Sequence, residues 1–546
     1  MVFNSLVFLA FLGIVLLLYY RLGFRAQNWM LIGASYLFYG WWDYRFVALL
    51  LFTTFFDYVC ALWIDRETRP ARRRLLLASS MTVNLGVLCI FKYFNFFAAS
   101  LQSAVAVFGV HLSFPMLHVV LPVGISFYTF LSMSYTIDVY RRELKPTHDP
   151  TEFMLYVAYF PHLVAGPIVR ASILLPQCQK PRVIVPEQVA NGLWLMLMGY
   201  VKKVVIADRL AQAVNWGFAQ GRPPFADGNS WLLLYAFAFQ IYGDFSGYSD
   251  IARGLAKIMG FELVENFRAP YLVTNPASFW RHWHISLSTW LRDYLYVPLG
   301  GNRHGRLNTY RNLMTTMLLG GLWHGAGVAY VLWGLYHGAL LAVHRLWHDL
   351  TGAKRGAQPV AGEAVAAERV DSREPATAAV AAASAPELAL PALPAMGASF
   401  KLEEWKPTNP PPAEGRKRVG LRAAVPARLG LAGWLKQAIL VVLFFHITNV
   451  GWLLFRAGSL PAGVSQLHFV LDYLRALAVW PGAVQPMAHG ILVLGAVSLF
   501  LQWKFDVMNR FSEWRLVWQV IGVTAALGAL AGLGIFEGSQ FIYFQF

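Results

Sequence analysis

The stretch Gly321–Gly327, with the sequence GLWHGAG, places one histidine between two apolar runs, Met314–Trp323 and Val328–Leu341. If these runs lie in lipid, His324 sits at membrane depth, where an imidazole is costly unless it faces protein or water. His324 is therefore a candidate functional residue. The alternative is a packing histidine that is hydrogen-bonded to a backbone carbonyl, and the position of His324 alone leaves both readings open.

The composition of the 546-residue chain indicates its class. Hydrophobic residues make up 57% of the chain and charged residues only 14%, whereas a soluble protein carries about 25% charged residues. We therefore expect an all-α polytopic membrane protein. The formal charge of +16 is typical of basic cytoplasmic loops and does not point to nucleic acid. The three cysteines have no CxxC spacing and indicate neither a disulfide framework nor a metal cluster.

The orientation follows from the basic residues after the N-terminal runs. Runs of about the length needed to span a bilayer cover Val2–Tyr20, Trp29–Trp41, Phe46–Ile64, Leu75–Phe97 and Met116–Val139. Arginines and lysines follow the first, third and fifth runs, so alternation puts all of them on one side of the membrane. Because cytoplasmic loops carry the basic excess, we predict an extracytoplasmic N-terminus.

The middle of the chain is less regular. Phe153–Val169 contains two prolines that interrupt a helix, and broken backbone at membrane depth needs protein or a water-filled cavity around it. Val189–Ile206 ends in lysines whose side of the membrane charge alone does not place. From Arg268 to Arg311 the chain is amphipathic and is predicted to be an interfacial stretch facing the cytoplasm. Met314–Trp323 and Val328–Leu341 then form a predicted re-entrant pair with His324 near its tip.

Three parts are expected along the chain: a membrane core over residues 1–350, an Ala/Pro-rich, disordered cytoplasmic linker over residues 351–432, and C-terminal transmembrane helices with a tail over residues 433–546. The last part contains the runs Leu435–Phe455, Ile491–Leu501 and Val517–Ile535. Basic residues between the last two runs predict that the tail, which ends in FIYFQF, is extracytoplasmic.

Several other polar residues are candidates for chemistry. His282 and His284 would point to different faces of one helix, and no third ligand follows at useful spacing, so we expect no metal site. Asp244 is able to orient an imidazole or to pair with a structural arginine, and the second reading is favoured for Asp250. His337 repeats the aromatic-His-Gly pattern of His324, with packing as its favoured role. Two further histidines are interpreted as structural, His162 and His446.

Four motifs carry a resemblance to a known family. Tyr242–Asp250 (YGDFSGYSD), Arg281–Gly301 (RHWHISLSTWLRDYLYVPLGG), Leu322–Ala326 (LWHGA) and Val450–Ala457 (VGWLLFRA) resemble the membrane-bound O-acyltransferases. The resemblance is strongest to the bacterial branch of alginate, cellulose and peptidoglycan O-acetylation proteins, with the lipoteichoic-acid D-alanylation protein as a relative. It covers everything except the linker. One departure is His282, where the family is expected to have Arg or Asn.

The resemblance implies a fold and a set of site residues. The fold is a ring of about 11–13 transmembrane or re-entrant helices around a cytoplasmic funnel and a central tunnel. His324 and His284 correspond to the family's two motif histidines, with His324 catalytic. Trp323, His337 and Asp244 are expected to support them. Tyr543 matches the tail tyrosine of the small D-alanylation peptide and would be an acyl relay, with an interfacial aromatic anchor as the alternative.

The implied activity is an O-acetyltransferase of the bacterial inner membrane, with both termini extracytoplasmic. Acetyl-CoA is the expected donor, no permanent cofactor is expected, and the cations proposed for the phosphates of CoA are Arg281, Arg292 and Arg303. The acceptor is an exported polysaccharide, alginate-like in the first place, with peptidoglycan, cellulose or teichoic acid as alternatives. Expected partners are membrane lipid, an extracytoplasmic SGNH-type or related acetyltransferase, and the exopolysaccharide machinery. A transporter or a non-catalytic scaffold of the export complex is the alternative of a different class.

Overall fold

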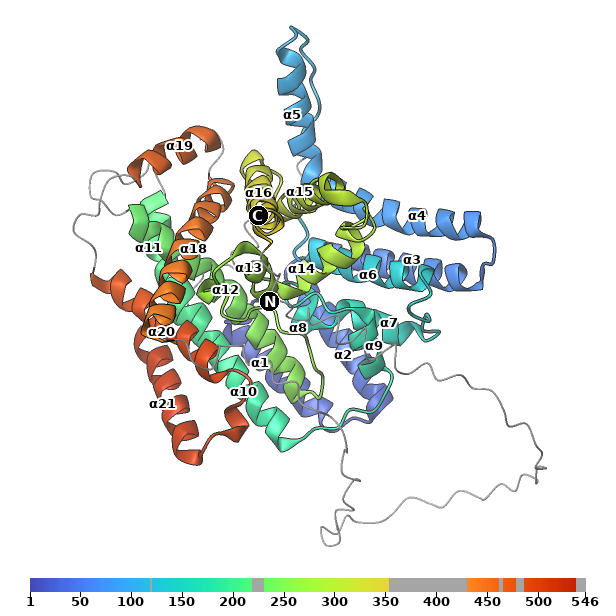
Figure 1. Cartoon of the computed structure of the whole chain (residues 1–546). Helices are drawn as coiled ribbons and strands as arrows, with labels where there is room; N and C mark the ends of the chain where they lie inside the picture. Colours follow the sequence, from blue (N-terminus) through green and yellow to red (C-terminus); the bar gives the residue numbers. More distant parts are fainter. Residues whose placement is uncertain (118–119, 219–229, 353–429, 461–464, 478–485, 537–546) are drawn as a thin grey trace, which may run out of the picture. The chain divides into compact units, whose positions relative to one another are not determined.

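The computed structural model describes residues 1–117, 120–218, 230–352, 430–460, 465–477 and 486–536. All regular secondary structure in these residues is helical, as predicted (Figure 1). Contacts group Met1–Trp347 with Lys436–Phe546 in one unit, and His348–Leu435 form a second; everything below concerns the first. Apart from a few residues at its two ends, the predicted linker lies outside the described residues, as does the tail with Tyr543.

The five N-terminal runs all form helices. They are α1 (Leu6–Tyr19), α2 (Phe24–Gly40), α3 (Arg45–Arg66), α4 (Pro70–Leu88), which continues through the π-helical segment η1 (Cys89–Tyr93) into α5 (Phe94–Ala106), and α6 (Ile125–Tyr140). The fourth run is therefore longer than predicted, because the helix continues past Phe97 to Ala106.

Hydrogen bonds join the ends of these helices in two groups. At one end, the Arg73 guanidinium donates to the carbonyl of Ile64 at 2.8 Å and to that of Tyr140 at 2.7 Å. Further along, at the start of α5, the Asn95 side chain exchanges two hydrogen bonds with the backbone of Leu117, which precedes α6, both of 2.9 Å. Helices α3, α4 and α6 therefore alternate in direction, and the Arg73 end is the basic one.

The interrupted segment is broken where its prolines predict a break. It consists of α7 (Pro150–Ala158), the single turn α8 (Phe160–Leu163) and α9 (Ala171–Cys178). The break at Tyr159 is completely buried, and the freed backbone N–H of Phe160 donates to Ser35 Oγ at 3.0 Å. Surrounding protein thus satisfies this irregular backbone, as it must at membrane depth.

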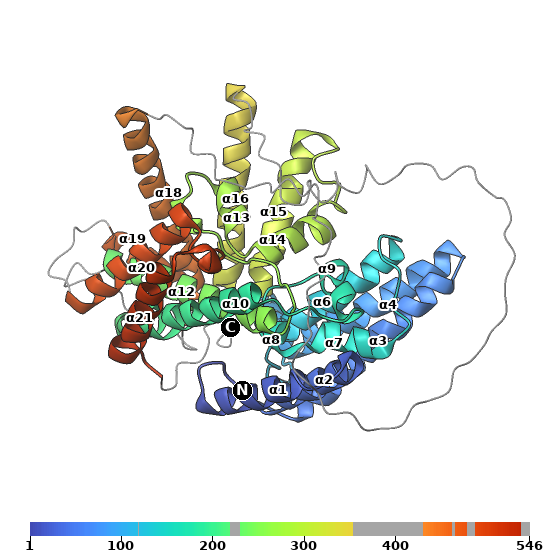
Figure 2. The same cartoon turned by 90° about the horizontal axis from the view of Figure 1, so that it is seen from below.

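A long buried pair of helices follows. These are α10 (Pro186–Tyr200), continued by the π-helical η2 (Val201–Ala207) and α11 (Asp208–Phe218), and α12 (Ser230–Ile258). The backbones of α10 and α12 touch: a Cβ on Gly247 would lie only 2.7 Å from the carbonyl oxygen of Gly199. Only glycine allows this approach, and Figures 1 and 2 show the two helices side by side.

The lysines that charge alone did not place are inside the protein. Lys202 Nζ lies 2.7 Å from Asp250 Oδ2, and Lys203 Nζ lies 2.6 Å from Asp244 Oδ1 and 2.9 Å from Asp208 Oδ1. Because these lysines are neutralised by buried acids, they carry no information about the side of the membrane. Asp250 was predicted to pair with an arginine; its shorter contact is with lysine, and Arg253 is at 3.4 Å.

The remaining helices include the hairpin that carries His324. The elements are η4 (Pro270–Leu272), α13 (Pro276–His282), α14 (Ile285–Leu291), η5 (Arg292–Tyr296), α15 (Gly305–His324), α16 (Val328–Thr351), α18 (Leu431–Ala457), α19 (Gln466–Ala476), α20 (Pro486–Phe505), η6 (Phe511–Glu513) and α21 (Leu516–Leu533). Sequence patterning missed α19, which is short. Among the described residues, five helices are long and apolar enough to cross a membrane: Arg45–Arg66, Pro70–Ala106, Pro186–Phe218, Leu431–Ala457 and Leu516–Leu533.

Candidate active site

The hairpin of α15 and α16 holds His324 at its turn, as the sequence predicts. The two helices are in backbone contact, because a Cβ on Gly321 would lie 2.3 Å from the carbonyl oxygen of Tyr330 and one on Gly334 would lie 2.4 Å from that of Met317. They run side by side in both views (Figures 1 and 2). His324 is the last residue of α15 and is only 3% exposed.

Aromatic side chains enclose the His324 ring. Its centroid lies 5.0 Å from that of Trp323, 4.9 Å from that of Trp333 and 5.3 Å from that of Phe455, all with edge-on geometry. His337 contacts the far side of Trp333 at 4.8 Å. The motif around Phe455 therefore reaches the same site as the histidine motif, although the two are far apart in the sequence.

His284 also contacts Trp323, with 6.0 Å between the ring centroids. It is completely buried and adopts a left-handed backbone conformation, with φ of 42°, just before α14. Such a conformation costs a non-glycine residue about 1–3 kcal/mol and occurs preferentially at functional sites. His282 and His284 do not share one helix: α13 ends at His282 and a new helix begins after His284.

Asn266 holds the turn at His284, and sequence reasoning missed it. Its side-chain oxygen accepts from Ser286 N at 3.2 Å and Ser286 Oγ at 2.8 Å, and lies 3.3 Å from His284 Nδ1. Its backbone carbonyl accepts from Ile285 N at 3.0 Å. Ser286 Oγ in turn accepts from Ile168 N at 3.0 Å, which ties the interrupted segment to the site. A lone asparagine in an irregular stretch gives no periodic signal that would reveal this role.

A small pocket opens beside His324. It is lined by Lys92, residues 121–127, Val164, Trp323 and His324, and contains about 50 Å³ of water-accessible space, which is room for a few water molecules. Gly124 begins α6 here with φ of 76°, and a Cβ on it would lie 2.9 Å from the carbonyl oxygen of Leu163. Glycine is therefore required to bring the start of α6 against α8.

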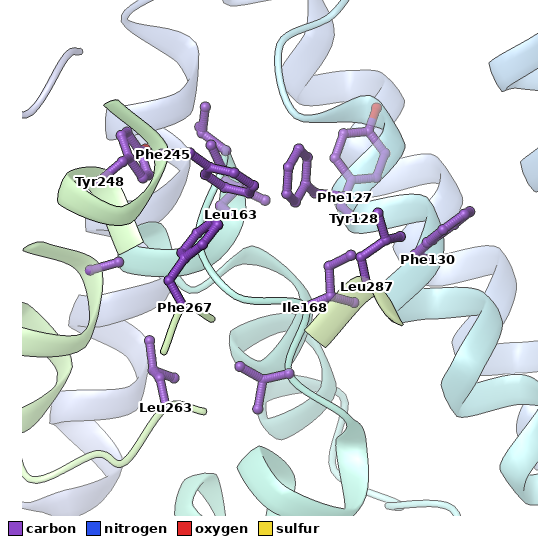
Figure 3. Packing of buried hydrophobic residues seen from close by; sticks show 14 of the residues in the cluster. Phe127, Tyr128, Phe130, Leu163, Ile168, Phe245, Tyr248, Leu263, Phe267 and Leu287 are labelled. Carbon is purple, nitrogen blue, oxygen red and sulfur yellow. The ribbon is translucent and has the colours of Figure 1, made fainter. Parts of the chain in front are cut away.

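Apolar side chains pack behind the histidines. Figure 3 shows Phe127 and Phe130 of α6, Leu163 of α8, Phe245 of α12 and Leu287 of α14 converging from separate parts of the chain. Phe245 contacts the His284 ring edge-on, with 4.6 Å between centroids. Water is excluded from this side of His284, and in such a dry site each dipole acts more strongly.

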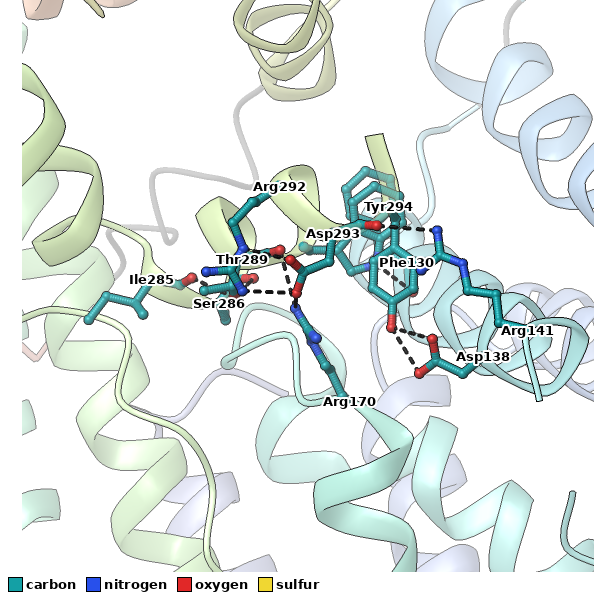
Figure 4. Close-up of polar contacts among 11 residues, drawn as sticks. Phe130, Asp138, Arg141, Arg170, Ile285, Ser286, Thr289, Arg292, Asp293 and Tyr294 are labelled. Carbon is teal, nitrogen blue, oxygen red and sulfur yellow. Dashed lines mark hydrogen bonds and ion pairs between the residues drawn. The ribbon is translucent and has the colours of Figure 1, made fainter. Parts of the chain in front are cut away.

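A basic cluster lies further along α6 (Figure 4). Arg292 Nε and Nη2 donate to the two carboxylate oxygens of Asp293 at 2.5 and 3.0 Å, and Arg170 pairs with the same carboxylate. Arg141 donates to the Asp293 carbonyl at 3.3 Å. The Tyr294 hydroxyl donates to Asp138. The sequence analysis had suggested Arg292 as a phosphate ligand but neither Arg170 nor Arg141.

The other two predicted phosphate ligands lie outside this cluster in the contacts that the structure gives them: Arg281 donates to Ser278 Oγ, and Arg303 is exposed.

Asp244 pairs with a lysine and not with an imidazole, which was one of the two partners considered for it. Its carboxylate forms an ion pair with Lys203, because η2 presents that lysine to α12. His446 lies away from His324 in the contacts that the structure gives it, with its ring 2.6 Å from the Tyr235 hydroxyl and 2.7 Å from the Val442 carbonyl. The structure therefore brings together His284, Trp323, His324 and His337, and leaves Asp244 to the α10–α12 pair.

These features define a multi-pass membrane protein with an enclosed pair of histidines beside a small pocket. The family model of the membrane-bound O-acyltransferases matches residues 74–359, which is more than half of the chain. The chain belongs to this family, and it is an O-acyltransferase.

The chain is similar to three individual members of this family. The probable alginate O-acetylase of Pseudomonas putida is 48% identical over 349 residues, covering 63% of this chain and 71% of the relative. The peptidoglycan O-acetyltransferase of Helicobacter pylori is 36% identical, covering 64% and 72%. The teichoic acid D-alanyltransferase of Bacillus subtilis is 27% identical, covering 41% and 59%.

Proposed function

We propose that this protein transfers acetyl groups from cytoplasmic acetyl-CoA across the bacterial inner membrane, for O-acetylation of an exported, alginate-like polysaccharide. His324 is the general base, and His284 positions or polarises the acyl carbonyl. The observation that carries the proposal is the buried His324 at the pocket, with buried His284 in contact with the neighbouring Trp323, in a chain that is 48% identical to a probable alginate O-acetylase.

Charge supports the orientation. Arg73 joins the ends of α3, α4 and α6, and five arginines, at positions 66, 69, 72, 73 and 74, cluster where α3 ends and α4 begins. The positive-inside rule assigns this end to the cytoplasm. Lys92 lies in η1, well past Arg73 along the continuous α4–α5 helix, and residues 121–127 lie at the start of α6, near the Asn95–Leu117 contact. The pocket at His324 then faces the extracytoplasmic side, where an exported polymer is acetylated.

We propose that the acyl donor is bound near the C-terminal end of α6 and that acyl transfer takes place near its N-terminal end. Phe127 near its start contacts Trp323 at 5.4 Å, whereas Asp138 near its end accepts from Tyr294, next to the Arg292–Asp293 pair. Eleven residues of helix span about 16 Å. We propose that the arginines hold the phosphates of acetyl-CoA at the cytoplasmic end, and that the thioester arm extends along α6 to the histidines.

The proposed chemistry is acyl transfer with general-base catalysis. Neutral His324 removes the proton from an attacking hydroxyl, a contribution of about 10²–10⁴-fold. The new bond joins the hydroxyl oxygen to the acetyl carbon, the bond from that carbon to sulfur breaks, and the CoA thiolate takes the proton back from the imidazolium. The hydroxyl belongs to Tyr543, to an extracytoplasmic SGNH-type partner or to the polymer itself. A tyrosine with an ordinary pKa near 10 needs such a base at neutral pH.

The first test is His324→Ala in the full-length protein. We expect the protein to accumulate normally and acetylation of the exported polymer to fall by at least about 10²-fold, measured as acetyl content per sugar. His446→Ala is the matched control, because that imidazole has partners away from the pocket. Wild-type acetylation in His324→Ala would refute the catalytic role and favour a scaffold.

The relay is tested separately with Tyr543→Phe, which keeps the aromatic ring and removes the hydroxyl. We expect acetylation of the polymer to be lost while CoA release from acetyl-CoA by membrane vesicles continues at a reduced rate. Normal acetylation in this variant would reduce the tail to a membrane anchor and leave the partner or the polymer as the direct acceptor.

A further inference from the structure

Lys92 lies beside the candidate catalytic histidine and was not singled out from the sequence. It belongs to η1, the π-helical segment between α4 and α5, and its ammonium reaches the end of α15. Nζ donates to the carbonyl of Trp323 at 2.7 Å and to that of His324 at 3.2 Å. The last carbonyls of a helix lack partners within the helix, so Lys92 caps α15 at the residue that carries the chemistry.

No acidic side chain among the described residues forms an ion pair with Lys92. Within the part of the chain that the structure describes, its polar contacts are the two carbonyls, and its ammonium also lies 5.9 Å from the centre of the Trp323 ring. A cation in an apolar environment is costly unless other groups compensate it. An ammonium has three N–H donors, and the contacts among the described residues use two of them. Lys92 also lines the same pocket as His324.

We propose that Lys92 is a further catalytic residue, whose remaining N–H donates to the oxyanion formed during acyl transfer. This inference rests on the proposed function, because it assumes an acyl thioester at His324. When the acceptor hydroxyl attacks, its oxygen bonds to the acyl carbon and its proton passes to His324. The electron pair of the C=O double bond moves onto the carbonyl oxygen, which becomes negative next to the ammonium. When the C–S bond breaks, that pair returns and the thiolate leaves.

Preorganisation is the physical reason for this assignment. The two carbonyl contacts hold the ammonium in place before the reaction, so little reorganisation is needed when charge develops on the substrate. The η1 bulge is what turns Lys92 toward α15, and π-bulges occur frequently at functional sites. Figure 1 shows α4 and α5 meeting close to α15, where η1 lies between them.

A purely structural capping role predicts a different outcome, and Tyr93 provides the control. Its hydroxyl donates to the carbonyl of Leu322 at 3.0 Å, so it holds the same helix end without a charge. Unlike Lys92, it does not line the pocket. Lys92→Met removes the charge at similar length, Lys92→Arg retains a cation, and Tyr93→Phe removes only the neighbouring hydrogen bond.

The experiment measures CoA release from acetyl-CoA by membrane vesicles that contain the full-length variants, normalised to the amount of protein. We expect Lys92→Met to lower kcat by about 10²–10³-fold with little change in the KM for acetyl-CoA, as removal of an oxyanion donor does. Lys92→Arg should retain a substantial part of the rate. Tyr93→Phe should stay within about threefold of wild type, because it removes a single neutral hydrogen bond.

The outcomes separate this inference from the function on which it rests. If His324→Ala is inactive while Lys92→Met keeps wild-type kcat, the assignment of Lys92 fails and the acyltransfer site stands. If Lys92→Met and Tyr93→Phe lower kcat equally, Lys92 is only a cap and the inference is overturned. If His324→Ala keeps wild-type CoA release, the proposed site itself fails.

Discussion

Two π-helical segments carry lysines into the interior, and their lysines have different surroundings. In η2, Lys202 and Lys203 pair with the carboxylates of Asp250, Asp244 and Asp208 at 2.6–2.9 Å. In η1, the hydrogen bonds of Lys92 to described residues go to backbone carbonyls, and its side chain lines the pocket at His324. The comparison teaches that burial of a cation does not identify its role. The partners of the lysine indicate its role. Lys202 and Lys203 are neutralised by carboxylates, whereas Lys92 is held by carbonyls at the pocket, where we propose that it contacts the substrate.

The largest effect on stability is expected at the paired site. Asp250→Leu leaves Lys202, which is 1% exposed, as a buried charge without its partner carboxylate. Breaking a buried ion pair from one side costs about 3–5 kcal/mol. We therefore expect a marked fall in the melting temperature of the detergent-purified protein, measured by intrinsic tryptophan fluorescence.

The double variant Asp250→Leu with Lys202→Met sharpens this test. It removes both charges of the closest pair while Arg253 keeps its hydrogen bond to Asn509, and apolar replacements of buried pairs are often neutral or stabilising. We expect most of the lost stability to return. If the double variant is as unstable as Asp250→Leu alone, loss of packing rather than the unpaired charge explains the effect.

A smaller effect on stability is expected for Lys92→Met. The variant leaves two carbonyls at the end of α15 without their donor, at a cost of about 1–3 kcal/mol, but it strands no charge. We expect the melting temperature of Lys92→Met to lie between those of the wild type and Asp250→Leu. We expect its kcat to fall further than that of Asp250→Leu. A melting temperature as low as that of Asp250→Leu would show that Lys92 is mainly structural and remove the contrast between the two segments.

The smallest effect is expected at an exposed pair. Arg510 donates to Glu513 at 2.5–2.8 Å, and both side chains are about half exposed. Many surface ion pairs contribute nothing measurable, because water already solvates both charges. We expect Arg510→Gln to leave both melting temperature and acetylation unchanged within error. A clear loss of stability would mean that this loop packs against another surface.

Sequence patterning predicted the helical class, most helix positions and the site histidines, because hydropathy and the His324 motif are local signals. It did not reveal Lys92 or Asn266. Lys92 lies in an apolar run, where nothing indicates that a π-helical turn directs it to a helix end 231 residues away. Asn266 lies in an irregular stretch and acts through a serine 20 residues later. Both roles depend on contacts between distant segments.

The sequence by itself determined that the chain is a helical membrane protein, where its basic loops lie and that His324 sits at the turn of a hairpin. These properties follow from composition and from the spacing of charges and glycines along one segment. Only the tertiary structure decided which charges are paired. Lys203 forms an ion pair with Asp244, whereas Lys92 donates to backbone carbonyls. Pairing depends on which helices pack together, and contacts such as Gly199 against Gly247 set that packing in three dimensions.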